Sequence, residues 1–343
     1  MKSTTTYTSN PSQLLFKSHE HSILSTRQAL FSFITEKSPA MGVATNKILH
    51  RKLEQASKDN LPVMFELFPW IIKDLTGIGQ RKINDISINW LALNLYVAFL
   101  DDHLDSKTEI KAEEFLGASI LAHKGLINLF KIVHGTEFEK LFNDSLFSAA
   151  HFQLEDVLSQ SKISRNKFSK LKSAYGKNGI LIACAGALAA AKLEKADFII
   201  DLTKSMLLSV QLLDDLADFE SDFKQNNITT LLNDVATKRK KKYFPLKRRK
   251  IISDFISTGA LLRVTQKVEQ SLSTSVTLIE NNVSGRTKSN PSYRFFTTLY
   301  VEVVSMRNLL EGLSSKFKAM PTKEKRAAIT EVDKSISKIC MHS

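Results

Sequence analysis

The sequence contains few cysteines, glycines and prolines, and each shortage excludes a class of structure. Two cysteines among 343 residues, Cys184 and Cys340, are too few for a disulfide framework, so we expect a reduced, cytoplasmic protein. The 12 glycines and 7 prolines leave long stretches that contain neither residue. Because both residues disfavour helix interiors, their scarcity favours a helical protein.

Long hydrophobic runs are also missing. The most apolar window covers residues 179–191, and its 13 residues fall short of the roughly 20 that a transmembrane helix needs. The polar N-terminus lacks the apolar core of a signal peptide. We therefore expect no transmembrane segment, and a buried helix over 179–191.

Positive charge is plentiful, with a formal net charge of +13. Such a charge suits an anionic partner, which leaves a diphosphate, a nucleic acid or a membrane surface open. The densest basic run covers residues 239–250, where Tyr243 and Phe244 are the only aromatic residues. Since single-stranded nucleic-acid sites use stacking aromatics, we expect no nucleic-acid partner, while peripheral membrane contact stays open. The sequence does not assign a role to the run itself.

Helical periodicity recurs through almost the whole chain, and no set of alternating strands is present. We predict an all-α, single-domain helical bundle over residues 19–343, preceded by a loose polar segment over residues 1–18. The pattern predicts a helix that ends at Gly77, followed by helices over residues 83–104, 110–134, 136–160, 164–192, 195–223, 254–281, 292–318 and 322–340.

Two aspartate clusters each end an apolar helical run. The first lies in NLYVAFLDDHLDSK and contains Asp101, Asp102 and Asp105. The second lies in SVQLLDDLADFESDFK and contains Asp214, Asp215, Asp218 and Asp222. A spacing of four residues places Asp214, Asp218 and Asp222 along one helix face, where like charges repel one another. We therefore expect bound cations at both clusters.

Carboxylate oxygens are typical ligands of Mg²⁺, which also keeps waters and binds substrate phosphates. Two facing carboxylate clusters would hold several such ions, and a diphosphate would bind between them with its ester bond polarised. The clusters therefore predict a metal-dependent diphosphate site. A single DDxxD motif in a helical chain would be a much weaker signal than the pair.

These motifs resemble those of the class I isoprenoid synthases, which include trans-prenyltransferases, squalene and phytoene synthases, and terpene cyclases. Residues 101–105 match the first DDxxD motif, and residues 211–218 match the prenyltransferase form QxxDDxxD. The resemblance implies an all-helical fold around a central apolar pocket, three Mg²⁺ ions and an allylic isoprenyl diphosphate as substrate. Homodimerisation is implied by the same analogy.

The resemblance also implies cations that bind the diphosphate. YGKNGILIACAGALAAA is similar to the prenyltransferase helix that begins with Lys-Thr-Gly, which makes Lys177 a diphosphate ligand. Lys224 follows the second cluster directly. Arg294 stands 80 positions after Asp214, about where terpene cyclases have an Arg-Tyr pair.

Two features of this family's prenyltransferases are missing. Residues 106–114, SKTEIKAEE, contain no arginine where a pair usually helps to bind isopentenyl diphosphate. A clean Gly-Lys-Arg motif upstream is also lacking, because GQRK at 79–82 lies too close to the first cluster. These departures favour a terpene synthase, a carbon–oxygen lyase that ionises one allylic diphosphate. The alternatives are a trans-prenyltransferase that adds isopentenyl diphosphate, a head-to-head condensing synthase, and a non-catalytic basic scaffold.

The carbocation left by ionisation needs a dry, apolar and aromatic pocket. Tyr96 and Phe99 lie within about a turn of the first cluster, and Gln211 lies one turn before Asp214, so we expect all three to line that pocket. Neither the chain length of the substrate nor the identity of the product can be read from these motifs.

Overall fold

The computed structural model describes residues 11–37, 64–106, 111–159, 179–192, 196–224, 228–239, 247–283 and 287–339. These ranges contain twelve α-helices, two short 3₁₀ helices and no strand, which confirms the all-α prediction. The helices are α1 (Pro11–Lys37), α3 (Met64–Thr76), α4 (Gln80–Ser106), α5 (Ala112–Val133), α6 (Glu139–Ser159), α8 (Ile180–Ala191), α9 (Asp197–Lys224), α10 (Thr230–Arg239), α11 (Arg248–Thr258), α12 (Ala260–Asn282), α13 (Pro291–Ser314) and α14 (Thr322–Ile339).

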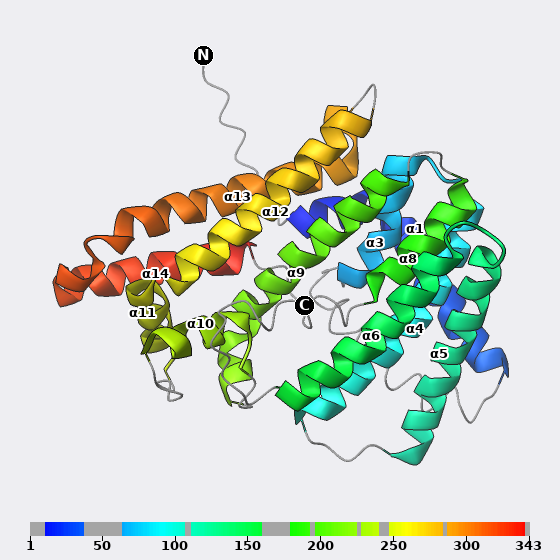
Figure 1. The fold of residues 1–343 in the computed structure, drawn as a ribbon, viewed down its shortest axis with the longest axis horizontal. Helices are drawn as coiled ribbons and strands as arrows, with labels where there is room; N and C mark the ends of the chain where they lie inside the picture. The colour runs from blue at the N-terminus through cyan, green and yellow to red at the C-terminus, as the bar shows by residue number, and fades with distance from the viewer. Residues whose placement is uncertain are drawn as a thin grey trace.

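The long helix α9 crosses the middle of the molecule (Figure 1). Helices α12 and α13 lie on one side of it, with α10, α11 and α14 gathered near its C-terminal half, while α4, α5, α6 and α8 lie on the other side. Side chains from almost all of these helices form one apolar core, in which Trp90, Phe219 and Phe296 are fully buried. Burial of such large side chains supplies most of the driving force for folding.

Helix α8 confirms the buried helix expected over residues 179–191. Its residues Ile182 to Leu188 are all buried, and Gly179 begins it with a φ of 63°, a left-handed conformation that glycine adopts without strain. Burial raises the pKa of the Cys184 thiol on this helix to about 12, because the charged thiolate would lose its hydration.

The structure differs from the predicted secondary structure in three places. Residues 11–18, predicted as loose, form the first turns of α1, because Leu15 is fully buried in the core. The helix predicted over 254–281 is divided at Gly259, where a φ of 70° ends α11 and begins α12. Helix α10 was not predicted at all, and residues 164–178 of another predicted helix lie outside the described residues.

Helices α4 and α5 form an antiparallel pair that approaches very closely at Gly125. A Cβ atom added there would lie 2.5 Å from the Asn89 carbonyl oxygen, so only glycine fits. The Asn128 amide donates to Asn89 Oδ1 at 3.0 Å, and further along Phe99 packs on Ala118. By length and composition alone, residues 115–133 of α5 would suffice to cross a membrane, although 39% of that window is buried in the bundle.

Helices α4 and α9 run toward the same end of the bundle (Figure 1). At their starting end, the Lys82 ammonium group of α4 donates to the Ala190 carbonyl oxygen of α8, and α9 begins shortly after α8 ends. From there, 19 residues separate Lys82 from Asp101 and 17 separate Asp197 from Asp214. At about 1.5 Å per residue, the two aspartate clusters lie at similar depths in the bundle.

Candidate functional site: two helix ends above an apolar cavity

The first aspartate cluster lies on the last turns of α4. Residues 101–106 are helical, and Asp101, Asp102 and Asp105 therefore end this helix as the sequence predicts. Their side chains lie outside the described residues, and so does all of Lys177. For the first cluster, the structure fixes the position of the backbone at the end of the bundle and nothing further.

The second cluster lies on α9, and its aspartates differ in exposure. Asp218 is exposed, and Asp214 and Asp222 are partly exposed, so the three members of the predicted row share the helix face that is not packed in the core. Among the described residues, no three His, Cys, Asp or Glu side chains form a group that could hold a metal ion. An ion on this row would therefore need further oxygen ligands, and phosphate, water and the first cluster are of the right chemistry.

Asp215 faces away from this row and is 3% exposed. One carboxylate oxygen accepts a hydrogen bond from the Gln211 side-chain amide at 3.2 Å, and the other accepts the Thr230 backbone N–H at 3.0 Å. Thr230 is the first residue of α10, whose N-terminal N–H groups have no partner within the helix. Asp215 thus joins the second cluster to the segment that follows it.

Two arginines near the C-terminal half of α9 form ion pairs that were not predicted from the sequence. Asp234 of α10 is fully buried and binds Arg263 of α12 through two guanidinium nitrogens, at 2.8 and 2.7 Å. Arg248 of α11 binds Asp333 of α14 at 2.9 Å and lies 4.7 Å from the ring centre of Phe219 in α9. The one signal in the sequence was the charge of Asp234 within the apolar run LLNDVA, since a buried carboxylate needs a partner.

Lys224 and Arg294, the two predicted diphosphate-binding residues that the structure describes, lie in different parts of the bundle. Lys224 ends α9, where its exposed ammonium group lies 3.2 Å from the Glu220 carboxylate of the same helix. Its position near Asp222 is compatible with the predicted role. An exposed i, i+4 pair of this kind contributes little stability, so the lysine remains available to an anion.

The structure does not bring Arg294 to the aspartates, which corrects the prediction. Arg294 is exposed in the first turn of α13, and the residue before it donates a hydrogen bond to Glu280, near the end of α12. Helix α12 runs antiparallel to α9 (Figure 1), and Ser271 meets Ser205 between them. Glu280 and Asp214 lie nine residues from that contact in opposite directions, roughly 25 Å apart along the bundle. The match in spacing did not reflect a match in three dimensions.

A cavity of about 430 Å³ lies among α4, α5, α6 and the start of α8. This volume is in the range of small-molecule sites. On α4 its lining extends from Trp90 to Leu100, a length of about 15 Å, and Leu100 directly precedes Asp101. Most of the wall is apolar, with contributions from Leu93, Val97, Ala122, Leu126, Leu146, Ala149, Ala150 and Ile182.

The residues predicted to line a pocket fall into three positions. Tyr96 lines this cavity. Phe99 is 9% exposed and packs on Ala118 instead, in a small cluster that also involves Tyr96. Gln211 is buried on α9, where its amide binds Asp215, and it lines neither this cavity nor the smaller one described next.

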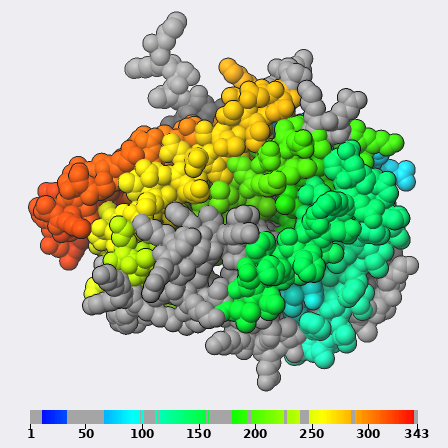
Figure 2. Space-filling model, in the orientation of Figure 1, coloured from blue at the N-terminus to red at the C-terminus, as the bar shows by residue number. Residues whose placement is uncertain are grey.

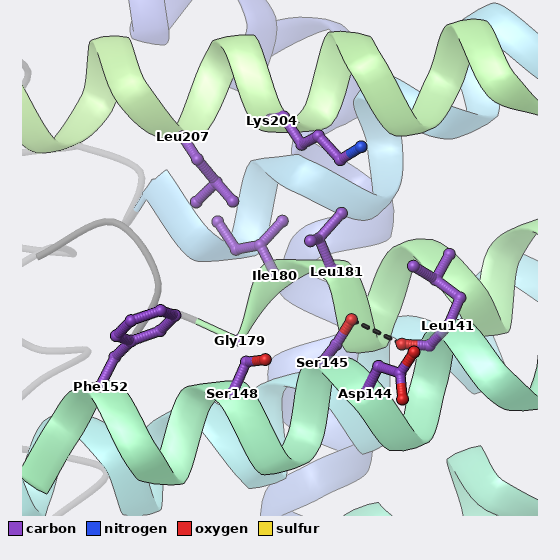
Figure 3. A pocket seen from close by; sticks show the side chains of 10 residues that line it. All are labelled: Leu141, Asp144, Ser145, Ser148, Phe152, Gly179, Ile180, Leu181, Lys204 and Leu207. Carbon is purple, nitrogen blue, oxygen red and sulfur yellow. Dashed lines mark hydrogen bonds between the residues drawn. The ribbon is translucent and has the colours of Figure 1, made fainter. Parts of the chain in front are cut away.

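A smaller cavity of about 230 Å³ lies between α6, the start of α8 and α9 (Figure 3). Leu207, Ile180 and Phe152 supply its apolar wall, and Gly179 borders both cavities. Its charged residues are engaged on their own helices: Lys204 lies 3.5 Å from Asp201, and Asp144 lies 2.6 Å from Lys140. The larger cavity, whose lining extends along α4 to Leu100 just before the first aspartate cluster, is therefore the better candidate for a substrate site.

Known structures share this architecture. A polyprenyl synthase from Roseobacter denitrificans superimposes with a TM-score of 0.65 over 86% of this chain and 98% of its own, at 10% identity. A geranylgeranyl pyrophosphate synthetase from the archaeon Geoglobus acetivorans does so with a TM-score of 0.60 over 82% and 99%, at 14% identity.

This similarity is not detected by comparison of sequences. No family model matches the chain, and no curated protein matches its sequence. At 10% and 14% identity the likeness lies in the fold, which covers nearly the whole of both known structures. The chain has the all-helical fold of the isoprenoid synthases.

Proposed function

We propose that this chain is a Mg²⁺-dependent enzyme that ionises an allylic isoprenyl diphosphate. The observation that carries the proposal is the apolar cavity along α4, which ends at Leu100, immediately before Asp101. An isoprenoid chain would fill the cavity, and its diphosphate would then lie between the ends of α4 and α9. The carboxylates that end these two helices are the groups that bind a metal–diphosphate complex.

The aspartates, the lysines and the cavity wall would have different roles in this reaction. Asp101, Asp102, Asp105, Asp214, Asp218 and Asp222 would hold three Mg²⁺ ions, which when bound would stabilise charge on the departing diphosphate. Lys177 and Lys224 would add positive charge to the same leaving group. Asp215 acts differently, because it accepts the Thr230 N–H and so holds α9 to α10. The apolar wall of the cavity would exclude bulk water from the carbocation.

Two reactions can follow ionisation, and different observations favour each. The similarity to a polyprenyl synthase and a geranylgeranyl pyrophosphate synthetase favours elongation with isopentenyl diphosphate. The lack of arginine in SKTEIKAEE, after the first cluster, favours a terpene synthase that uses the allylic substrate alone. Because of the fold, we propose elongation as the first candidate reaction and the terpene synthase reaction as the second.

One experiment separates these candidates. The protein would be incubated with geranyl, farnesyl or geranylgeranyl diphosphate, each with and without isopentenyl diphosphate and Mg²⁺, and the products analysed by mass spectrometry. A longer diphosphate that requires isopentenyl diphosphate identifies elongation, and release of diphosphate without it identifies a terpene synthase. Inertness in every mixture would favour a non-catalytic scaffold and sink the proposal.

We also propose that α5 and α6 form the contact of a homodimer. Figure 2 shows these two helices together at one face of the molecule. They carry most of the exposed large apolar side chains of the described residues: Phe115, Leu116, Ile120 and Ile127 on α5, and Phe147, Leu154 and Leu158 on α6. Helical spacing places Leu116, Ile120 and Ile127 in one stripe, a pattern suited to packing against another helix.

The oligomeric state tests this contact directly. We expect Phe147→Glu and Leu154→Glu to convert a dimer into a monomer in sedimentation experiments. Val301→Glu, which changes a similarly exposed apolar residue on α13, is the matched control and should leave the dimer intact. A wild-type protein that sediments as a monomer would rule the contact out.

A further inference from the structure

The cavity along α4 contains polar groups that a hydrocarbon chain cannot use. Asn94 lines it and is 6% exposed. The side-chain amide nitrogen donates to the Trp90 carbonyl oxygen at 3.3 Å, which directs the amide oxygen Oδ1 elsewhere. In the part of the chain that the structure describes, Oδ1 accepts no hydrogen bond. Asn94 faces the cavity, and a hydrocarbon alone in that cavity would leave Oδ1 without a donor at a cost in free energy, so we expect a bound group to donate to it.

His123 of α5 lines the same cavity at its solvent-exposed rim and presents a second acceptor. Its Nδ1 atom lies 2.6 Å from the Ser119 carbonyl oxygen. Because a carbonyl oxygen can only accept, Nδ1 carries the hydrogen, and Nε2 of the neutral ring is then an acceptor. No hydrogen bond to Nε2 is present among the described residues.

The two acceptors lie at the same level of the cavity. Asn94 and His123 are each midway along their helix between the two contacts described above that set the antiparallel register of α4 and α5. Asn94 also precedes Asp101 by seven residues, or roughly 10 Å along α4. The acceptor pair therefore lies well below the diphosphate end of the cavity, beside the body of a bound chain.

We infer that Asn94 and His123 hold a water molecule that captures the carbocation and yields an isoprenoid alcohol. A water that donates one hydrogen to Asn94 Oδ1 and the other to His123 Nε2 turns its lone pairs toward the cavity. Cleavage of the C–O bond releases diphosphate with the electron pair and leaves the cation. The water oxygen then forms the new C–O bond, and its surplus proton moves to His123 Nε2, from which it passes to solvent when the product leaves.

This inference rests on the proposed ionisation step, and specifically on a cation that is not trapped by isopentenyl diphosphate. The product class that the cavity favours is an isoprenoid alcohol. The step requires no oxidant or reductant, because water supplies both the oxygen and the hydrogen of the product hydroxyl group. His123 acts as the base, and Asn94 positions the water.

The test uses the full chain with Mg²⁺ and farnesyl or geranylgeranyl diphosphate in H₂¹⁸O, with products analysed by mass spectrometry. We expect an enzyme-dependent alcohol that carries one ¹⁸O atom. Asn94→Leu and His123→Phe should each lower the ratio of alcohol to hydrocarbon about tenfold or more, because the first variant no longer positions the water and the second has lost the base. His151→Phe, at an exposed histidine of α6 that does not line the cavity, is the matched control and should not change the ratio.

A binding measurement separates failure of this inference from failure of the proposed function. Trp90 lines the cavity, so its fluorescence reports binding of geraniol or of the hydrocarbon myrcene without metal or turnover. One hydrogen bond from the ligand hydroxyl should make wild type bind geraniol roughly three- to tenfold more tightly than Asn94→Leu, with equal binding of myrcene.

The outcomes decide between the two proposals as follows. Diphosphate release without labelled alcohol would overturn the water-capture step and leave the proposed function standing. A protein that releases no diphosphate from any allylic substrate sinks the proposed function, and the fluorescence titration then decides whether the acceptor pair binds a hydroxyl group. Equal affinity of wild type and Asn94→Leu for geraniol would overturn the inference by itself.

Discussion

Carboxylates in two regions of the bundle have different surroundings. Among α1, α3 and α13, Glu66 is buried against Arg27, and Asp74 accepts hydrogen bonds from His19 and Ser292. On the second half of α9, a row of aspartates is partly or fully exposed and repeats one charge at every turn. Burial against a partner marks a structural carboxylate, whereas accessibility within a row of like charges marks one suited to binding a ligand.

The largest expected effect belongs to the buried pair. Glu66→Ala leaves the Arg27 guanidinium, only 7% exposed, without its partner in the core. The free energy of unfolding should fall by about 3–5 kcal/mol in urea denaturation. Asp144→Ala, which breaks an exposed pair with Lys140 on α6, is the control and should cost less than about 1 kcal/mol. Equal losses would show that burial does not distinguish structural carboxylates from exposed ones.

Asp214→Ala should lower activity strongly and leave stability almost unchanged. Diphosphate release should fall on the order of 10²–10³-fold, because charge stabilisation of the leaving group is lost. The free energy of unfolding should change by less than about 1 kcal/mol, because the side chain is partly exposed and a like-charge neighbour along the helix is removed. Asp201→Ala, at an exposed aspartate near the start of α9, should change neither quantity. A marked loss of stability in Asp214→Ala would place this residue with the structural carboxylates.

Asp215 tests whether the distinction holds between adjacent residues. Asp215→Ala removes the acceptor of the Gln211 amide and of the Thr230 N–H, both in a buried setting. We expect a loss of about 1–3 kcal/mol in thermal or urea unfolding. The difference from Asp214→Ala, measured under the same conditions, is the informative quantity. If both variants unfold alike, burial does not separate the two roles.

Gly125→Ala should have a moderate effect on stability and also alter the cavity. The added methyl group would lie 2.5 Å from the Asn89 carbonyl oxygen and force α5 away from α4. Overpacking of this kind costs about 1–3 kcal/mol. Because Ala122 and Leu126 line the cavity on either side of Gly125, we expect the product distribution to change as well. Gly312→Ala, on α13 with open space around its Cα, is the control.

The elements of this fold were largely predictable, because helical periodicity is a local signal. Two exceptions have local causes. Gly259 divides a periodic stretch through its backbone conformation, and the apolar Leu15 places a polar segment in the core. The third exception, α10, is short and shows little amphipathic pattern, and it is bound by Asp215 and Arg263, which lie elsewhere in the chain.

The site was predictable only in part. The row on α9 follows from spacing alone, but spacing cannot tell that Asp215 turns inward while Asp214 does not. Arg294 matched a distance in sequence and lies at the other end of α12, because a long antiparallel helix pair reverses direction between them. Asn94 and His123 carry no motif and come together only through the packing of α4 on α5.

The hydrogen bond from the Thr230 N–H to Asp215 connects α10 to the predicted cation site. Asp214, a predicted cation ligand, directly precedes the residue whose carboxylate accepts this first N–H of α10. We expect cation binding at Asp214 to stabilise this part of α9 and, through Asp215, the start of α10. Amide hydrogens of α10 should therefore exchange with solvent more slowly when divalent cations are added.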